Sequence, residues 1–154
     1  MATLEKVLLA AQGYSELGMH DDALAELDSL PEEEQHEYTV VEARTQVHIG
    51  AKKWEPALAT AVVLCKEDPV RPTGFIHAAF CLHELGRTEE ARNLLLEGPS
   101  TLHREPTFHY NMACYECRLG QLDVARAHLE KSFQLDKHFR QLAKSDPDLV
   151  ALRP

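Results

Sequence analysis

The hydrophobic positions of this chain predict short amphipathic helices that occur in pairs. Within residues 3–17, apolar side chains follow at three- and four-residue steps, the spacing of one helix face: Leu4, Val7, Leu8, Ala11, Tyr14 and Leu17. Gly18 comes next, and a glycine there suits the left-handed conformation that ends many helices. A second periodic segment runs from Asp21 to Leu30, before Pro31. This stretch therefore predicts a helix, a turn and a second helix.

Three further pairs follow the first. Their first helices also run to a glycine: Gly50, Gly86 and Gly120. Within a single domain over residues 1–154, we expect repeats at about 3–34, 37–69, 72–105 and 106–137. Beyond them, apolar residues between Phe139 and Leu152, interrupted at Asp146 and Pro147, indicate a short helical tail over about 138–152. Because a stack of helices needs its last apolar face covered, we expect this tail to cap the fourth repeat.

Four alanines define the period of these pairs. Ala23, Ala57, Ala91 and Ala125 follow one another at intervals of 34 residues, and a fixed spacing in this range is typical of a repeat array. In three pairs the alanine comes five residues after the glycine, but Ala57 comes seven residues after Gly50. We therefore expect two extra residues, about Ala51 and Lys52, to lengthen the second turn or the end of the helix before it.

These landmarks together resemble the tetratricopeptide repeat, a helix-turn-helix unit of 34 residues. The fourth pair matches its pattern best, with Tyr110-Asn111-Met112-Ala113-Cys114-Tyr115, then Leu119-Gly120, Ala125-Arg126 and Leu129. In that pattern the small position of the first helix falls on Ala11, Ala43, Ala79 and Ala113. The resemblance implies an all-α fold, a right-handed α-solenoid of four repeats with a C-terminal capping helix, similar to small free-standing bacterial proteins of this kind.

The same resemblance implies where a partner would bind. In this family the first helices line a groove that holds partner peptides or helices, and the corresponding positions here are Gln12, Arg44, His48, Ile76, Phe80, His83, Tyr110, Cys114 and Cys117. Phe80 and Tyr110 are the expected anchors, because aromatic residues dominate interface hot spots. His83 and Arg44 would add directional polar contacts. The alternative is that Phe80 packs against a neighbouring helix and that the chain's own tail fills part of the groove.

The negative charge of the chain lies almost entirely in its first quarter. Residues 1–40 carry ten acidic side chains and one base, Lys6, whereas residues 41–154 are neutral, so the net charge of −9 belongs to the N-terminal part. Nucleic acid is an improbable partner, because no basic stripe is present to neutralise phosphates. The acidic part would steer a basic partner, or it is simply a solvated helix face with an exposed loop at Glu32–Glu34.

No membrane segment or secretory signal is expected. No stretch approaches the roughly 20 apolar residues of a membrane helix, and the N-terminal residues lack a basic region followed by an apolar run. Four cysteines in 154 residues are too few for a disulfide-stapled scaffold and suit reduced thiols. We therefore expect a cytoplasmic protein.

The main candidate for chemistry is the pair Cys114 and Cys117. Residues at i and i+3 share a helix face, as do His77 and Cys81 at i and i+4, so four ligands for zinc would converge if the two helices packed together. The alternatives are a redox pair or two small packing residues. No phosphate loop, nucleophile motif or paired carboxylates appear, so we expect neither an enzyme nor a cofactor.

The sequence thus favours a non-catalytic adaptor or scaffold that binds a protein or peptide in its groove. One alternative is a self-associating structural module, with a homodimer formed through an apolar patch at Leu4, Val7 and Leu8. Another is a metal- or thiol-binding protein that uses Cys114 and Cys117.

Overall fold

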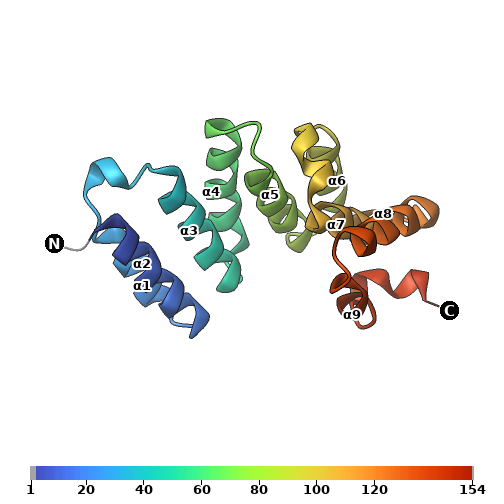
Figure 1. The fold of residues 1–154 in the computed structure, drawn as a ribbon, viewed down its shortest axis with the longest axis horizontal. Helices are drawn as coiled ribbons and strands as arrows, with labels where there is room; N and C mark the ends of the chain where they lie inside the picture. Colours follow the sequence, from blue (N-terminus) through green and yellow to red (C-terminus); the bar gives the residue numbers. More distant parts are fainter. Residues whose placement is uncertain (1–2, 154) are drawn as a thin grey trace. The chain divides into compact units, whose positions relative to one another are not determined.

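A computed structural model describes residues 3–153 and shows helices joined by short turns (Figure 1). The first helices of the pairs are α1 (Leu4–Glu16), α3 (Tyr38–Gly50), α5 (Pro72–Glu84) and α7 (Pro106–Arg118). The second helices are α2 (His20–Asp28), α4 (Trp54–Glu67), α6 (Thr88–Leu96) and α8 (Leu122–Leu135). Each first helix packs against the second helix that follows it. The expected all-α architecture of sequential helix pairs is confirmed.

Three 3-10 segments and one short helix complete the chain. η1 (Glu32–Glu34) follows α2, η2 (Ser100–Arg104) follows α6, and the C-terminus consists of α9 (Phe139–Ala143) and η3 (Pro147–Leu152). The tail expected over 138–152 is therefore two short elements, separated close to Asp146. Within residues 3–153, no helix combines the length and apolar character needed to cross a bilayer.

The chain divides into two compact units, unit 1 (Met1–Asp68) and unit 2 (Pro69–Pro154). In each unit, the first pair has a second helix of nine residues followed by a 3-10 segment, and the second pair has a second helix of fourteen residues. The two units share this internal order. A single domain over residues 1–154 stays a prediction.

Local sequence explains where several helices begin. The Thr3 hydroxyl accepts a hydrogen bond from the Lys6 N–H at 3.3 Å and caps α1. Pro72 and Pro106 are the first residues of α5 and α7, where the missing N–H has no helical partner to lose. Pro56 lies in the first turn of α4 and is tolerated for the same reason.

The four turns between first and second helices have the same backbone conformation. Gly18, Gly86 and Gly120 have φ of 75°, 80° and 83°, and Lys52 occupies the equivalent place with φ of 58°. In every turn the next N–H donates to a carbonyl five residues earlier at 2.8 Å; the donors are Met19, Lys53, Arg87 and Gln121. This is the Schellman arrangement, which satisfies carbonyls at a helix end.

The expected insertion at Ala51 and Lys52 is therefore wrong. Gly50 is the last residue of α3, and Lys52 adopts the left-handed conformation that glycine adopts in the other turns. The first helices begin at Leu4, Tyr38, Pro72 and Pro106, at intervals of exactly one 34-residue repeat. The period is continuous, and only the residue type at one turn changes.

The unbroken period also changes which residue of α3 faces α4. Thr45, and not Ala43, is the residue one repeat after Ala11, and it is fully buried. The Thr45 hydroxyl donates to the Val41 carbonyl at 2.9 Å and lies 2.7 Å from the Thr60 hydroxyl of α4. Ala43 is only half-buried. The assignment of Ala43 to the small position was an error that followed from the supposed insertion.

Unit 1 has a small apolar core between its helix pairs. Val7, Ala11, Leu27 and Val40 belong to it, and Leu4 and Leu8 pack against it from the side. Val7 is almost fully buried, so the exposed patch expected at Leu4, Val7 and Leu8 is reduced to the partly buried Leu4 and Leu8.

Unit 2 is organised around α7. Nine of its thirteen residues are buried: Phe108 to Tyr110 and Met112 to Cys117. Helices α5, α6 and α8 pack against α7, together with η2 and η3. The C-terminal segment therefore covers part of a first helix as well as part of α8.

We predict that Lys52→Gly stabilises the protein. A side chain in the left-handed conformation costs about 1–2 kcal/mol, and a glycine avoids most of that cost. For a protein of this size, this corresponds to a rise of about 2–4 °C in Tm, measured by circular dichroism on heating. The control is Ala51→Gly in the same turn, where φ is −80° and no gain is expected. A Tm for Lys52→Gly at or below that of the wild type would contradict the assignment of strain to this turn.

Candidate functional site

An open groove lies between α1 and α3 of unit 1. Its volume is about 400 Å³, and its lining is Leu8, Ala11, Gln12, Ser15, Glu16, Thr39, Glu42, Ala43, Gln46 and Val47. Apolar side chains of both helices contribute to it, and Gln12 donates its amide to the Glu16 carboxylate at 3.0 Å. The lining includes two carboxylates and no basic side chain.

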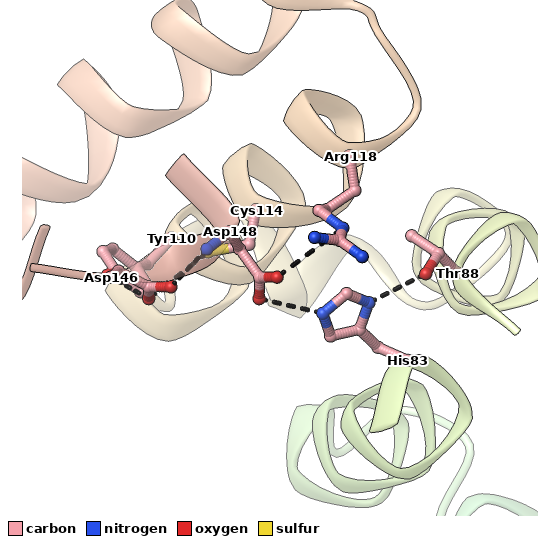
Figure 2. A network of polar contacts seen from close by, with 7 residues as sticks. All are labelled: His83, Thr88, Tyr110, Cys114, Arg118, Asp146 and Asp148. Carbon is pink, nitrogen blue, oxygen red and sulfur yellow. Dashed lines mark hydrogen bonds and ion pairs between the residues drawn. The ribbon is translucent and has the colours of Figure 1, made fainter. Parts of the chain in front are cut away.

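The equivalent positions in unit 2 carry different side chains. Two repeats separate α1 from α5 and α3 from α7, so Ser15, Glu42 and Gln46 correspond to His83, Tyr110 and Cys114. In unit 2 these three residues contact the C-terminal tail, which we define as residues 139–153 (Figure 2). The surface that forms an open groove in unit 1 is therefore covered in unit 2.

Asp146 makes the first group of contacts. The Tyr110 hydroxyl donates to Asp146 Oδ2 at 2.6 Å, and Cys114 Sγ lies 3.8 Å from the same oxygen. The other carboxylate oxygen accepts the Asp148 N–H at 2.9 Å, which caps η3. Asp146 thus starts η3 and fixes it to α7.

Asp148 makes the second group of contacts. Its Oδ2 lies 2.9 Å from His83 Nε2, and its Oδ1 lies 3.8 Å from Arg118 Nε. On the other side of the imidazole, His83 Nδ1 lies 2.9 Å from the Thr88 hydroxyl, so the ring is held between α6 and the tail (Figure 2). With Nε2 protonated, His83 donates to Asp148 and accepts from Thr88.

Apolar contacts accompany these polar ones. Leu149 is almost fully buried, and the Phe139 ring lies 4.8 Å from the Tyr110 ring between centroids. The Arg153 guanidinium donates to the Ala143 carbonyl at 3.0 Å and to the Asp146 carbonyl at 2.5 Å, which joins η3 to α9. Both carboxylates of the tail therefore contact the helices of unit 2 that precede it, and Leu149 is buried beside them.

Burial determines the protonation of the two donors facing Asp146. Burial, followed by the hydrogen bond to Asp146, raises the pKa of Tyr110 far above its usual value. Burial, followed by the charges of Asp146 and Asp148, likewise raises the pKa of the Cys114 thiol. Both groups keep their protons at neutral pH, so the surface of unit 2 that meets the tail carboxylates presents hydrogen-bond donors.

Three residues of unit 1 were expected in a groove. Gln12 lines the groove between α1 and α3, whereas Arg44 and His48 lie outside it. The Arg44 guanidinium pairs with Asp28 Oδ1 at 2.7 Å and also donates to the Gln35 side chain, so it lies at the connection between α2 and α3. His48 is half-buried outside the groove lining, and burial, with Arg44 and Lys53 nearby, lowers its pKa.

The supposed insertion explains this displacement. Glu42 and Gln46 are one repeat before Ile76 and Phe80, so they are the residues that a continuous period selects, and both line the groove. Counting back 34 residues from Ile76 and Phe80 identifies Glu42 and Gln46 from the sequence alone.

In unit 2, three of the residues expected in the groove lie close together. They contact Asp146 and Asp148, which were not among the expected residues. His83, Tyr110 and Cys114 meet at the tail, whereas Ile76 and Phe80 are half-buried on α5 and Cys117 is buried in α7. A partner-binding role for these residues stays a prediction. In the sequence, Asp146 stands out only as part of a helix interruption with Pro147, and Asp148 gives no signal, because carboxylates beside a proline are typical of any loop.

The expected zinc ligands do not converge. Within the part of the chain that the structure describes, the group of potential ligands consists of Cys114, Asp146 and Asp148, whose ligand atoms lie within 4.8 Å of one another. His77 and Cys81 are not members of it. The two carboxylates of this group already accept hydrogen bonds from Tyr110 and His83, so the arrangement is explained without a metal.

No family model and no curated protein sequence matches the chain. Solved structures of MamA do match. MamA MSR-1 C2 has a TM-score of 0.69 at 20% identity and covers 89% of this chain and 79% of its own. The MamA RS-1 ArsTM double mutant has a TM-score of 0.73 at 14% identity, and the match covers 92% of this chain and 78% of that one. MamA AMB-1 P212121 has a TM-score of 0.67 at 18% identity, and the match covers 99% of this chain and 79% of that one.

MamA is a tetratricopeptide-repeat protein. The present chain has the tetratricopeptide-repeat fold. The resemblance found in the sequence is thereby confirmed for the fold, and identities of 20% and below carry the comparison no further.

We predict that the thiols of Cys65 and Cys81 react slowly with alkylating reagents at neutral pH. Burial raises the pKa of Cys65 and of Cys81 to about 11, and the thiolate is the reactive form. Alkylation of the half-buried Cys65 should therefore accelerate about tenfold per pH unit between pH 7 and 9.5, because the thiolate fraction grows in that proportion below the pKa. Mass spectrometry after timed iodoacetamide treatment measures it, with Cys65→Ser as the control. A thiol as reactive at pH 7.5 as free cysteine would contradict this prediction.

Proposed function

We propose that the protein is a non-catalytic interaction scaffold, and that the groove between α1 and α3 of unit 1 binds a short, positively charged segment of a partner protein. The observation that carries the proposal is the open groove itself. It has a volume of about 400 Å³, and Leu8, Ala11 and Val47 contribute apolar surface next to polar side chains. Pockets of this size and mixed lining are typical of ligand sites in proteins.

The charge of the groove supports a basic partner. Glu16 and Glu42 contribute carboxylates, and the groove lies in the acidic part of the chain, where residues 1–40 hold ten acids. A lysine or arginine of the partner would gain an ion pair here, and the field of the acidic residues would accelerate association at low salt. The side chains of Gln12, Gln46 and Thr39 offer hydrogen bonds to the backbone of a bound segment.

The other two functions suggested by the sequence have less support. Val7 is buried in the core of unit 1, so the apolar patch on which self-association would rest is reduced to the edges of Leu4 and Leu8. The raised pKa of Cys114 and the separation of His77 and Cys81 from the Cys114 group weigh against a thiol or zinc protein. We therefore keep protein binding as the single proposal.

A selection from random peptides tests the proposal directly. Twelve-residue peptides displayed on phage would be selected on the immobilised full-length protein, then synthesised and titrated by fluorescence anisotropy. We expect selected peptides to be enriched in lysine and arginine beside apolar residues, and to bind Glu42→Lys at least tenfold more weakly, because this change reverses a charge in the groove.

The matched control is Glu55→Lys, which makes the same change at an exposed position of α4 outside the groove. It should bind the selected peptides as the wild type does at moderate salt, because screening over about 8–10 Å weakens distant charges. Equal binding by both variants, or selection without enrichment of basic residues, would refute the proposed groove and its preference for a basic partner.

A further inference from the structure

The tail of unit 2 is bound in the manner of a peptide ligand. Four consecutive residues, Asp146-Pro147-Asp148-Leu149, supply two carboxylates and one buried apolar side chain. The groups that meet the carboxylates belong to α5 and α7: His83, Tyr110, Cys114 and Arg118. The contacting residues lie between 30 and 65 residues apart in the sequence, so these contacts are not part of the local folding of the tail.

The set of groups facing the tail matches an acidic segment. Each of the four can donate a hydrogen bond, and Arg118 adds a positive charge at one end. Donors that converge on two carboxylate groups from different helices form charge-assisted hydrogen bonds, which are the stronger class. Figure 2 shows them arranged along η3, with Tyr110 and Cys114 at Asp146 and with His83 and Arg118 at Asp148.

The fold does not require these donors. Unit 1 has the same order of helices, and at the positions of His83, Tyr110 and Cys114 it has Ser15, Glu42 and Gln46. The residue of unit 1 that corresponds to Arg118 is Gly50. Unit 1 folds around its own core with an open groove, so these positions of unit 2 are free to specialise in recognition.

An apolar subsite completes the arrangement. Leu149 is buried, and beside it lies a pocket of about 400 Å³ lined by Leu129, Phe133, Arg140, Ala143, Lys144, Leu149, Leu152 and Arg153. The pocket is formed between α8 and the tail, so the tail does not fill the space available to it. Val150 and Leu142 of the tail are more than half exposed. A segment this incompletely buried is expected to open locally at a lower free energy than the core.

We infer that the face of unit 2 formed by His83, Tyr110, Cys114 and Arg118 is a binding site for an acidic segment of another protein, with two carboxylates two residues apart followed by an apolar side chain. The tail occupies this site in cis and competes with that partner. The inference concerns a different surface from the groove of unit 1, and the two sites prefer opposite charges. Because a tethered segment acts at an effective concentration in the millimolar range, a partner binds weakly until the tail is loosened.

A synthetic peptide with the sequence of residues 145–153 provides the probe. Labelled with fluorescein at its N-terminus, it would be titrated against the full-length wild type and against the double variant Asp146→Asn, Asp148→Asn, with anisotropy as the readout. The double variant retains every donor of the site but removes the charges of the competing tail. We expect it to bind the peptide at least tenfold more tightly than the wild type.

Two controls show that the peptide occupies the proposed site. A peptide with both aspartates replaced by asparagine should bind the double variant at least tenfold more weakly, because the charge-assisted bonds are lost. Adding His83→Ala and Tyr110→Phe to the double variant should weaken binding of the acidic peptide to a similar extent. Glu42→Lys, which tests the groove of unit 1, should leave this binding unchanged, so the two proposals fail or succeed separately.

The inference is overturned if the folded double variant fails to bind the acidic peptide up to millimolar concentration. It is equally overturned if the asparagine peptide binds as well, or if the changes at His83 and Tyr110 have no effect. Should the double variant not fold, Arg153→Ala replaces it in the same titrations. That change removes the bonds to the Ala143 and Asp146 carbonyls and loosens the tail without altering the site.

Discussion

The structure depends on the close approach of paired helices at one alanine in every repeat. Ala23, Ala57, Ala91 and Ala125 are fully buried, and a larger side chain at such a contact costs about 1–3 kcal/mol through overpacking. A turn of constant length and conformation precedes each of them. Together the contact and the turn determine where every first helix begins, and hence which of its residues face the neighbouring first helix of the same unit. The constraint acts on the backbone and leaves those side chains free to vary.

That freedom explains how one architecture carries two different surfaces. In unit 1 the variable positions are Ser15, Glu42 and Gln46, and they border an acidic open groove. In unit 2 the same positions are His83, Tyr110 and Cys114, which meet the carboxylates of the tail. Charge separates the two surfaces more sharply than shape does. An acidic tail would be repelled by the carboxylates of the first surface and is held by the donors of the second.

Burial of an apolar side chain and satisfied polar groups together hold the tail. Leu149 removes apolar surface from water, while Asp146 accepts from Tyr110 and from the backbone of η3. Burial alone would make a carboxylate costly, and hydrogen bonds from protonated donors offset that cost. The same burial raises the pKa of Tyr110 and of Cys114, so both groups keep the protons that they donate to Asp146. The thiol is therefore a packing and hydrogen-bonding group and a poor nucleophile.

The sequence by itself determined the helix pairs, their period and the tetratricopeptide-repeat fold, because amphipathic spacing and a recurring small residue are local properties that repeat along the chain. It misled at Lys52, where a lysine adopts the conformation of a glycine and only the backbone reveals that the period is unbroken. The error shifted the expected positions of α3 by two residues, so that Arg44 was expected in place of Gln46 and Glu42 was missed. The sequence indicated a tail that caps the fourth repeat or fills part of the groove, but the residues that hold the tail in place were decided by tertiary structure. His83 and Asp148 are 65 residues apart, and no periodicity connects a loop carboxylate with a helix that far away.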